Sequence, residues 1–167
     1  MQEEELRDLV KKIQFRKSEG QEVEVKKAAQ DCPGSLYDTL SSFSNQTSGG
    51  VIVFGLDENN GFCVCGVYDA QDLQHKVGAQ CREMEPQVRA LFTSAEIEGK
   101  VVVAAEIPPQ DVIKRPVYYK GKGRLGGSFV RVGDADERMT EFEVYSYDSY
   151  QHHVKNDRRI IEEADLS

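Results

Sequence analysis

Two runs of apolar residues constrain the fold of this chain more than any other feature. The first reads VIVFGL at residues 51–56 and predicts a central strand that is buried on both faces of a sheet. The second reads KVVVAAEI at residues 100–107 and ends at Pro108-Pro109, so it predicts another strongly apolar strand. A strand buried on both faces needs further layers to cover it, and the rest of the chain has to supply them.

Helical spacing and capping signals predict several helices around these strands. Leu6, Leu9 and Ile13 recur at helical spacing, which indicates an amphipathic first helix. Thr140 and Glu143 form a capping box that starts a last helix. The first helix is expected at residues 4–14. Further helices or helical pieces are expected at residues 33–46, 69–84 and 86–92.

Shorter strands complete the predicted sheet. Residues 21–26 alternate strictly, with Val23 and Val25 on one side and polar residues on the other, as in a strand with one polar face. Residues 57–61 predict a turn that contains Asn-Gly, and residues 62–67 predict the strand that returns from it.

This order of elements indicates an α+β fold. We expect a single domain over residues 1–150, with a mixed β-sheet and flanking helices. The polar segment 151–167 is predicted to be a linker or tail toward a C-terminal domain.

Composition excludes several classes of protein. Hydrophobic residues make up 39% of the chain and charged residues 30%, as in soluble globular proteins, and no apolar run is long enough to span a bilayer. The charged start MQEEELRDLV is not a secretion signal. The four cysteines show no C-x-x-C spacing, so we expect them to be small buried side chains of a protein in the reducing cytoplasm. We expect no zinc site.

A glycine-rich stretch, GKGRLGG at residues 121–127, contains the G-x-G-x-x-G pattern of dinucleotide-binding loops. That pattern binds a pyrophosphate only where it leads from a strand into the N-terminus of a helix. Here residues 116–119 and 128–132 both predict strands, so we interpret the stretch as the tip of a hairpin and expect no nucleotide cofactor.

Positive charge is concentrated on this predicted hairpin. The chain has a net charge of −8, yet residues 114–133 hold six cations and no acidic residue. These cations are Lys114, Arg115, Lys120, Lys122, Arg124 and Arg131. This concentration of positive charge predicts a surface that binds a polyanion. The alternative is an edge hairpin whose lysines prevent edge-to-edge aggregation.

Three stretches of the sequence resemble a known family. They read EVEVK at residues 22–26, SFSNQTSGGVIVFGLDENNGFCVCGV at 42–67, and RPVYYKGKGRLGGSFVRVGDADERM at 115–139. In this order they resemble the Schlafen-type, Alba-like DNA-binding domain that is called AlbA_2. The resemblance implies an Alba-like or Schlafen-core-like fold at the start of a bacterial transcriptional regulator, ahead of a divergent ATPase-like region and a winged helix.

The same resemblance implies an alternative function. In eukaryotic relatives this domain can be a metal-dependent ribonuclease, and the matching carboxylates here are Glu19, Glu24 and Asp57, with Lys26 beside them. Three converging carboxylates would hold Mg²⁺ or Mn²⁺, which activates water. The alternative is structural, because Glu24 beside Lys26 suits a salt-bridged strand and Asp57 suits a turn. We expect no other cofactor or metal.

A nucleic-acid-binding module of a transcriptional regulator is the leading prediction, and binding is favoured over catalysis. Its partner would be DNA or RNA, bound through the hairpin with strong dependence on salt. The residues expected to carry this role are Arg115, Lys120, Lys122, Arg124 and Arg131. An oligomerisation or ligand-sensing domain of a larger regulator stays open as a third interpretation.

Overall fold

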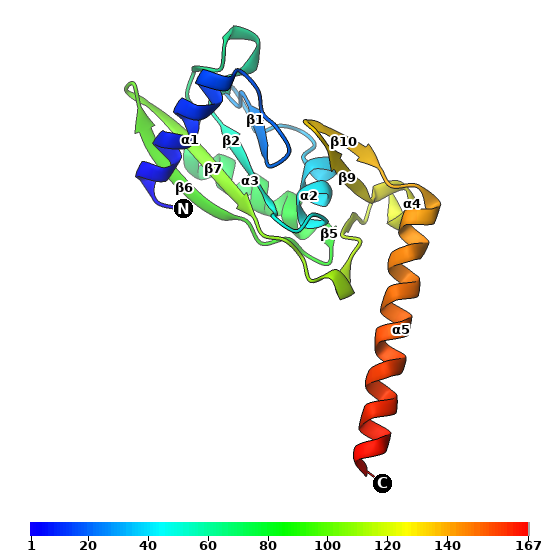
Figure 1. Ribbon diagram of the computed structural model, residues 1–167. Helices are drawn as coiled ribbons and strands as arrows, with labels where there is room; N and C mark the ends of the chain where they lie inside the picture. The colour runs from blue at the N-terminus through cyan, green and yellow to red at the C-terminus, as the bar shows by residue number, and fades with distance from the viewer. Residues whose placement is uncertain (167) are drawn as a thin grey trace.

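A four-stranded sheet forms the centre of the computed structural model, which describes the backbone of residues 1–166 and the side chains of residues 1–160 (Figure 1). Its strands lie in the order β1 (Val23–Lys26), β2 (Gly50–Phe54), β7 (Lys100–Ile107) and β6 (Leu91–Ile97). β1 runs parallel to β2, and the other neighbours are antiparallel. The predicted α+β fold with a mixed sheet is confirmed, and the two apolar runs lie at the centre of the sheet.

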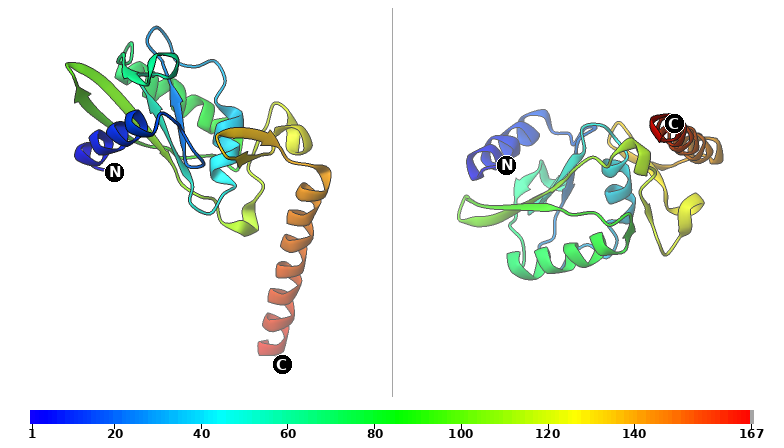
Figure 2. Two further views of the ribbon diagram at one scale, coloured as in Figure 1. Left: turned by 45° about the horizontal axis from the view of Figure 1, so that its top comes forward. Right: turned by 90° about the horizontal axis from the view of Figure 1, so that it is seen from below.

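Helices cover both faces of this sheet. α1 (Glu3–Arg16) lies on one face, and α2 (Tyr37–Ser44) and α3 (Ala70–Arg82) lie on the other (Figure 1, Figure 2). Neighbouring residues of β2 therefore enter different cores, since Val53 packs with α1 and Phe54 packs with α2 and α3. Each such side chain removed from water contributes about 1.5–3 kcal/mol to folding.

Short elements surround the main sheet. Three two-stranded ladders pair β3 (Leu56–Asp57) with β4 (Cys63–Val64), β5 (Met84–Glu85) with β8 (Tyr118–Tyr119), and β9 (Phe129–Val132) with β10 (Ala135–Arg138). The short helices are η1 (Glu58–Asn60), η2 (Val112–Lys114) and α4 (Gly123–Gly127).

The last helix, α5 (Glu141–Leu166), extends away from the rest of the domain (Figure 1, Figure 2). The predicted capping box is confirmed, because Thr140 Oγ1 accepts from the Glu143 N–H and the Glu143 carboxylate accepts from the Thr140 N–H. Residues 151–166, for which the sequence predicts a linker or tail, continue the same helix. Within residues 1–166, no helix is long and apolar enough to cross a membrane.

Two predicted helices differ from the structure. The helix expected from residue 33 begins at Tyr37, while the helix expected at residues 86–92 is wrong because β6 begins at Leu91. The two-residue turn Glu98-Gly99, with positive φ at both residues, closes β6 onto β7 as a hairpin. Pairing with an apolar neighbour strand thus prevails over the local helical pattern.

The hairpin predicted at residues 116–132 is also wrong. β8 pairs with β5 and β9 with β10, so a single bridge between Tyr118 and Ser128 joins the two strands. Buried side chains at the end of α2 take the backbone groups that a hairpin would pair. Asn45 bonds the N–H and carbonyl of Val117 and the Phe129 carbonyl, at 2.7, 3.1 and 3.0 Å.

Candidate nucleic-acid interface

The exposed turn between β8 and α4 presents the glycine-rich stretch. The N–H of Lys122 bonds the Tyr119 carbonyl at 3.2 Å, and the N–H of Gly123 bonds the Lys120 carbonyl at 3.3 Å. Gly123 has a φ of +74°, and a Cβ at Gly121 would lie 2.5 Å from the Tyr119 ring. The glycines are therefore needed for the shape of the turn.

Lys120 and Lys122 project from this turn and form only loose ion pairs. Lys120 Nζ lies 4.0 Å from a Glu85 oxygen, and Lys122 Nζ lies 3.9 Å from an Asp38 oxygen. The two lysine side chains are 46% and 55% exposed, so solvent screens both pairs. Both ammonium groups remain accessible to a phosphate.

Arg124 is held more firmly than the two lysines. Its guanidinium donates to the carboxylate of Asp148, and this pair joins α4 to α5. The carbonyl of Arg124 also accepts from Ser128 Oγ at 2.6 Å. Arg124 thus braces the turn against the last helix.

Arg115 and Arg131 lie inside the protein. Arg115 Nε donates to the Gln110 carbonyl at 2.8 Å, which fixes the start of the segment that leads into β8. The Arg131 side chain is 0% exposed and bonds Glu24 at 2.6 Å and Asp136 at 3.1 Å. Arg131 therefore does not reach the protein surface, whereas the sequence-based hypothesis has it contact a phosphate there.

Aromatic rings lie beside the turn. Tyr37 and Tyr119 stack with ring centroids 3.7 Å apart and an interplanar angle of 7°. The Phe129 ring is buried beneath Lys122, whose Nζ lies 5.8 Å from the ring centroid. Phe129 is therefore part of the support of the turn, and the half-buried tyrosine pair forms its aromatic side.

The structure brings two of the three predicted carboxylates together around Arg131. Glu19 lies 3.8 Å from Arg131 Nη2 and accepts from the Val25 N–H at 3.2 Å, while Glu24 pairs with Arg131 and with Lys26. Burial raises the pKa of Glu19 to about 8, reinforced by the charge of Glu24 and by Glu58. The hydrogen bond from the Val25 N–H opposes this shift, but burial prevails.

Asp57 does not join that pair. It lies 3.6 Å from Lys27 Nζ and accepts from the Asn59 N–H at 3.1 Å, as a turn residue does. Among the residues that the structure describes, no three His, Cys, Asp or Glu side chains are grouped so that they could hold a metal ion. Glu19, Glu24 and Asp57 therefore do not fit a bound Mg²⁺ or Mn²⁺ in this arrangement.

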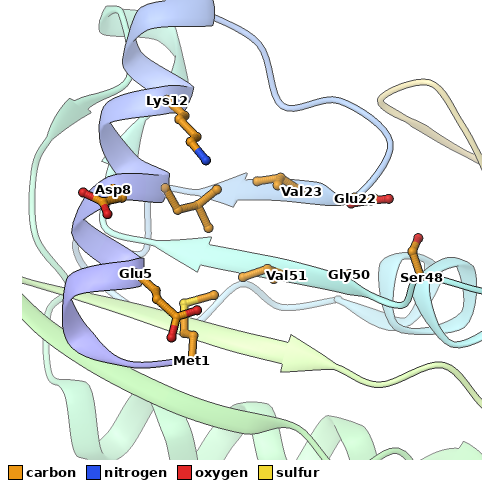
Figure 3. A pocket seen from close by; sticks show the side chains of 10 residues that line it. Met1, Glu5, Asp8, Lys12, Glu22, Val23, Ser48, Gly50 and Val51 are labelled. Carbon is orange, nitrogen blue, oxygen red and sulfur yellow. The ribbon is translucent and has the colours of Figure 1, made fainter.

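A groove of about 360 Å³ opens between α1 and the strands β1 and β2 (Figure 3). Carboxylates of Glu5, Asp8 and Glu22 line it together with Lys12, above a floor that includes Val51. Three negative charges against one positive charge disfavour a phosphate in this groove.

Comparison with known proteins gives a match to one family. The model of the family described as "Schlafen, AlbA_2" matches residues 19–140, which is most of the chain. A comparison with curated proteins finds no match.

Two solved structures share the fold. The N-terminal domain of a RecG-related protein from Nitrosomonas europaea has 25% sequence identity and a TM-score of 0.59, over 80% of this chain and 92% of that one. The DIP2311 protein from Corynebacterium diphtheriae has 18% identity and a TM-score of 0.54, over 89% of this chain. The chain spans only 29% of the length of the DIP2311 protein.

Proposed function

Because the chain belongs to the Schlafen, AlbA_2 family, we propose that it is a nucleic-acid-binding module of a larger regulator. The family and the RecG-related neighbour both fit a nucleic-acid-related domain. The name of that neighbour relates it to an ATP-dependent DNA helicase, which favours DNA as the ligand. Membership in a larger protein is supported by the C. diphtheriae chain, of which this fold is a minor part.

The observation that carries this proposal is the turn with Lys120 and Lys122. Both ammonium groups are exposed, their acidic neighbours lie at the limit of an ion pair, and a phosphate would displace those neighbours at small cost. Phosphate contacts of this kind give affinity without sequence preference and position the protein on its ligand.

A binding experiment with matched variants tests the proposal. The affinity of the parent and of Lys120→Gln/Lys122→Gln for labelled duplex DNA is measured by fluorescence anisotropy across a salt series. We expect the variant to bind more weakly and to lower the slope of log K against log salt by about 0.9 for each phosphate that is no longer neutralised. Lys76→Gln, at an exposed lysine paired with Asp31 and Asp72, is the control. Equal slopes for parent and variant would contradict the proposal.

We do not propose a metal-dependent nuclease, because Asp57 pairs with Lys27, Arg131 pairs with Glu24, and the raised pKa of Glu19 keeps that acid protonated near neutral pH. The same titration with Mn²⁺ added checks this choice, since cleavage of the labelled strand would favour the nuclease. Sedimentation of the protein alone checks the third interpretation, since a stable oligomer without affinity for nucleic acid would favour it.

A further inference from the structure

The C-terminal half of α1 carries a second group of cations. The group consists of Lys11, Lys12 and Arg16 on the helix and Lys17 directly after its last residue, and all four are exposed. Among the side chains of residues 1–160, none of them has a carboxylate partner within the 4.0 Å limit of an ion pair. We call these four residues and Phe15 the α1 surface.

Phe15 lies in the middle of the α1 surface. It is 90% exposed, although α1 buries its apolar stripe of Leu6, Val10 and Ile13 completely in the core. At 100° per residue, Phe15 projects from the side of the helix opposite to that stripe. Folding of the domain therefore does not account for an aromatic ring at this position.

The charges have a partial structural explanation, and the ring has none. Cations in the last turns of a helix stabilise it through the helix dipole, and the three glutamates in the first turn of α1 do the same at the other end. That effect requires neither four cations without partners nor an exposed phenyl ring among them. Cations interleaved with an aromatic ring are the combination that binds the phosphates and an unstacked base of a single strand.

We propose that the α1 surface binds single-stranded nucleic acid, with phosphates on the four cations and one base stacked on Phe15. This inference rests on the proposed function and adds to it the class of ligand and a second contact surface. α1 precedes residues 19–140, over which the family model matches, so the surface is a feature of this chain beyond the matched region.

The surroundings of the α1 surface restrict where the strand runs. Lys12 lines the groove beside α1 with Glu5, Asp8 and Glu22 and points toward β1 (Figure 3), so the negative charge of the groove keeps a polyanion on the side of α1 that carries Phe15. α1 and α4 lie at opposite ends of the domain in every view (Figure 1, Figure 2). The two cationic surfaces are therefore separate, and separate variants can remove the charges of each one.

A membrane surface fits the α1 surface less well. An interfacial helix needs a broad apolar face to enter the lipid, and the apolar face of α1 is already in the core. One exposed ring is enough to stack on a base, but it does not anchor a helix in a bilayer.

Phe15→Ala is the variant that tests the stacking. Anisotropy is measured with a labelled oligo-dT strand of about 20 nucleotides and with an abasic strand of the same length, which offers phosphates without bases. We expect Phe15→Ala to weaken binding of oligo-dT about five-fold or more and to leave binding of the abasic strand unchanged. Phe142→Ala is the matched control, since Phe142 is 80% exposed on α5. Equal affinity of Phe15→Ala and Phe142→Ala for oligo-dT would overturn the proposal.

A second variant tests the charges and separates the two proposals. We expect Lys11→Gln/Lys12→Gln to lower the salt slope for oligo-dT by about 0.7 for each phosphate that is no longer neutralised. If Lys120→Gln/Lys122→Gln weakens binding and the α1 variants do not, the α1 proposal fails and the proposed function stands. If the parent binds neither duplex nor single strand, both fail. Far-ultraviolet circular dichroism confirms that α1 is retained, because glutamine is a good helix former.

Discussion

The two cationic regions of this molecule differ in a way that charge counts along the chain do not reveal. Residues 114–133 hold six cations and no acidic residue, whereas α1 and the segment that follows it carry a balanced mixture. In the folded protein the order reverses. Most of the six cations are paired or buried, and the four of the α1 surface have no carboxylate partner among residues 1–160.

The difference arises from what the fold brings to each region. Glu85, Asp38 and Asp148 come from three other elements and lie against Lys120, Lys122 and Arg124. On α1, Glu3 and Glu4 pair with Arg7, whereas the cations farther toward the C-terminus form no such pair with any described side chain. Positive charge that is available to a ligand therefore depends on tertiary contacts more than on local composition.

Replacing Arg131 should have the largest effect on the protein. Arg131→Met removes the buried cation that Glu24 and Asp136 share and leaves Glu24 only its longer pair with Lys26, so we expect a loss of about 3–5 kcal/mol in the free energy of unfolding. Urea denaturation measures this loss. Arg138→Met, at an exposed arginine on the neighbouring strand β10, is the control and should change stability by less than about 1 kcal/mol. Similar losses in the two variants would show that the ion pairs of Arg131 do not stabilise the fold more than an exposed arginine does.

The pH dependence of stability should report the environment of Glu19. Its pKa is raised from 4.5 to about 8, so the stabilisation linked to its proton is complete below about pH 4.5 and is lost as the pH rises toward 8. Glu19→Gln imitates the neutral acid and should remove this dependence. Linkage alone would give the variant about 4 kcal/mol over the parent between about pH 5 and pH 8, and solvent screening of the half-buried Glu19 lowers the gain that we expect to on the order of 2 kcal/mol. A constant difference in unfolding free energy across that range would contradict the assignment.

Removing the acidic neighbours of the turn should strengthen binding. Glu85→Gln/Asp38→Asn frees Lys120 and Lys122 from their pairs, and we expect about two- to five-fold tighter binding of duplex DNA. Glu96→Gln/Glu98→Gln removes the same charge from the β6–β7 hairpin and controls for the change in net charge. An equal gain in affinity for duplex DNA in both double variants, measured by anisotropy, would mean that the ion pairs of Lys120 and Lys122 do not weaken their binding to DNA.

The smallest effect is expected at the contact between α4 and α5. Asp148→Asn removes the partner of Arg124, which is partly exposed, so we expect a loss of only about 0.2–1 kcal/mol in stability. Thermal unfolding measures it. A loss above about 2 kcal/mol would show that this pair does more than brace the turn.

Local patterns predict the elements whose structure is decided locally. The spacing of Leu6 and Ile13 marks α1, the apolar runs mark β2 and β7, and Thr140 with Glu143 marks the start of α5. The pairing of β8 with β5 leaves no such trace, because it depends on how Asn45 holds Val117 against α2. The positions of Glu85 and Asp38 beside the turn also leave no local pattern, because tertiary contacts bring them there.

The burial of Arg131 did leave a signal in the sequence. Alternate residues of a strand face the same side, so Arg131 shares a side with Phe129, and the two are the buried residues of β9. The alternation indicates burial of both side chains, but the number of positive charges nearby pointed to the surface. A cation in phase with a buried aromatic residue is better interpreted as an internal ion pair.

The most direct test of this account compares the two cationic regions in one salt series. Lys11→Gln/Lys12→Gln and Lys120→Gln/Lys122→Gln each remove two charges, and their affinities for labelled oligo-dT are measured beside that of the parent. We expect strongly salt-dependent binding by the parent and a lower slope in both variants. The larger loss of affinity is expected in the α1 variant, whose cations have no acidic partners to displace. A parent whose binding does not depend on salt, or two variants that match it, would contradict the account.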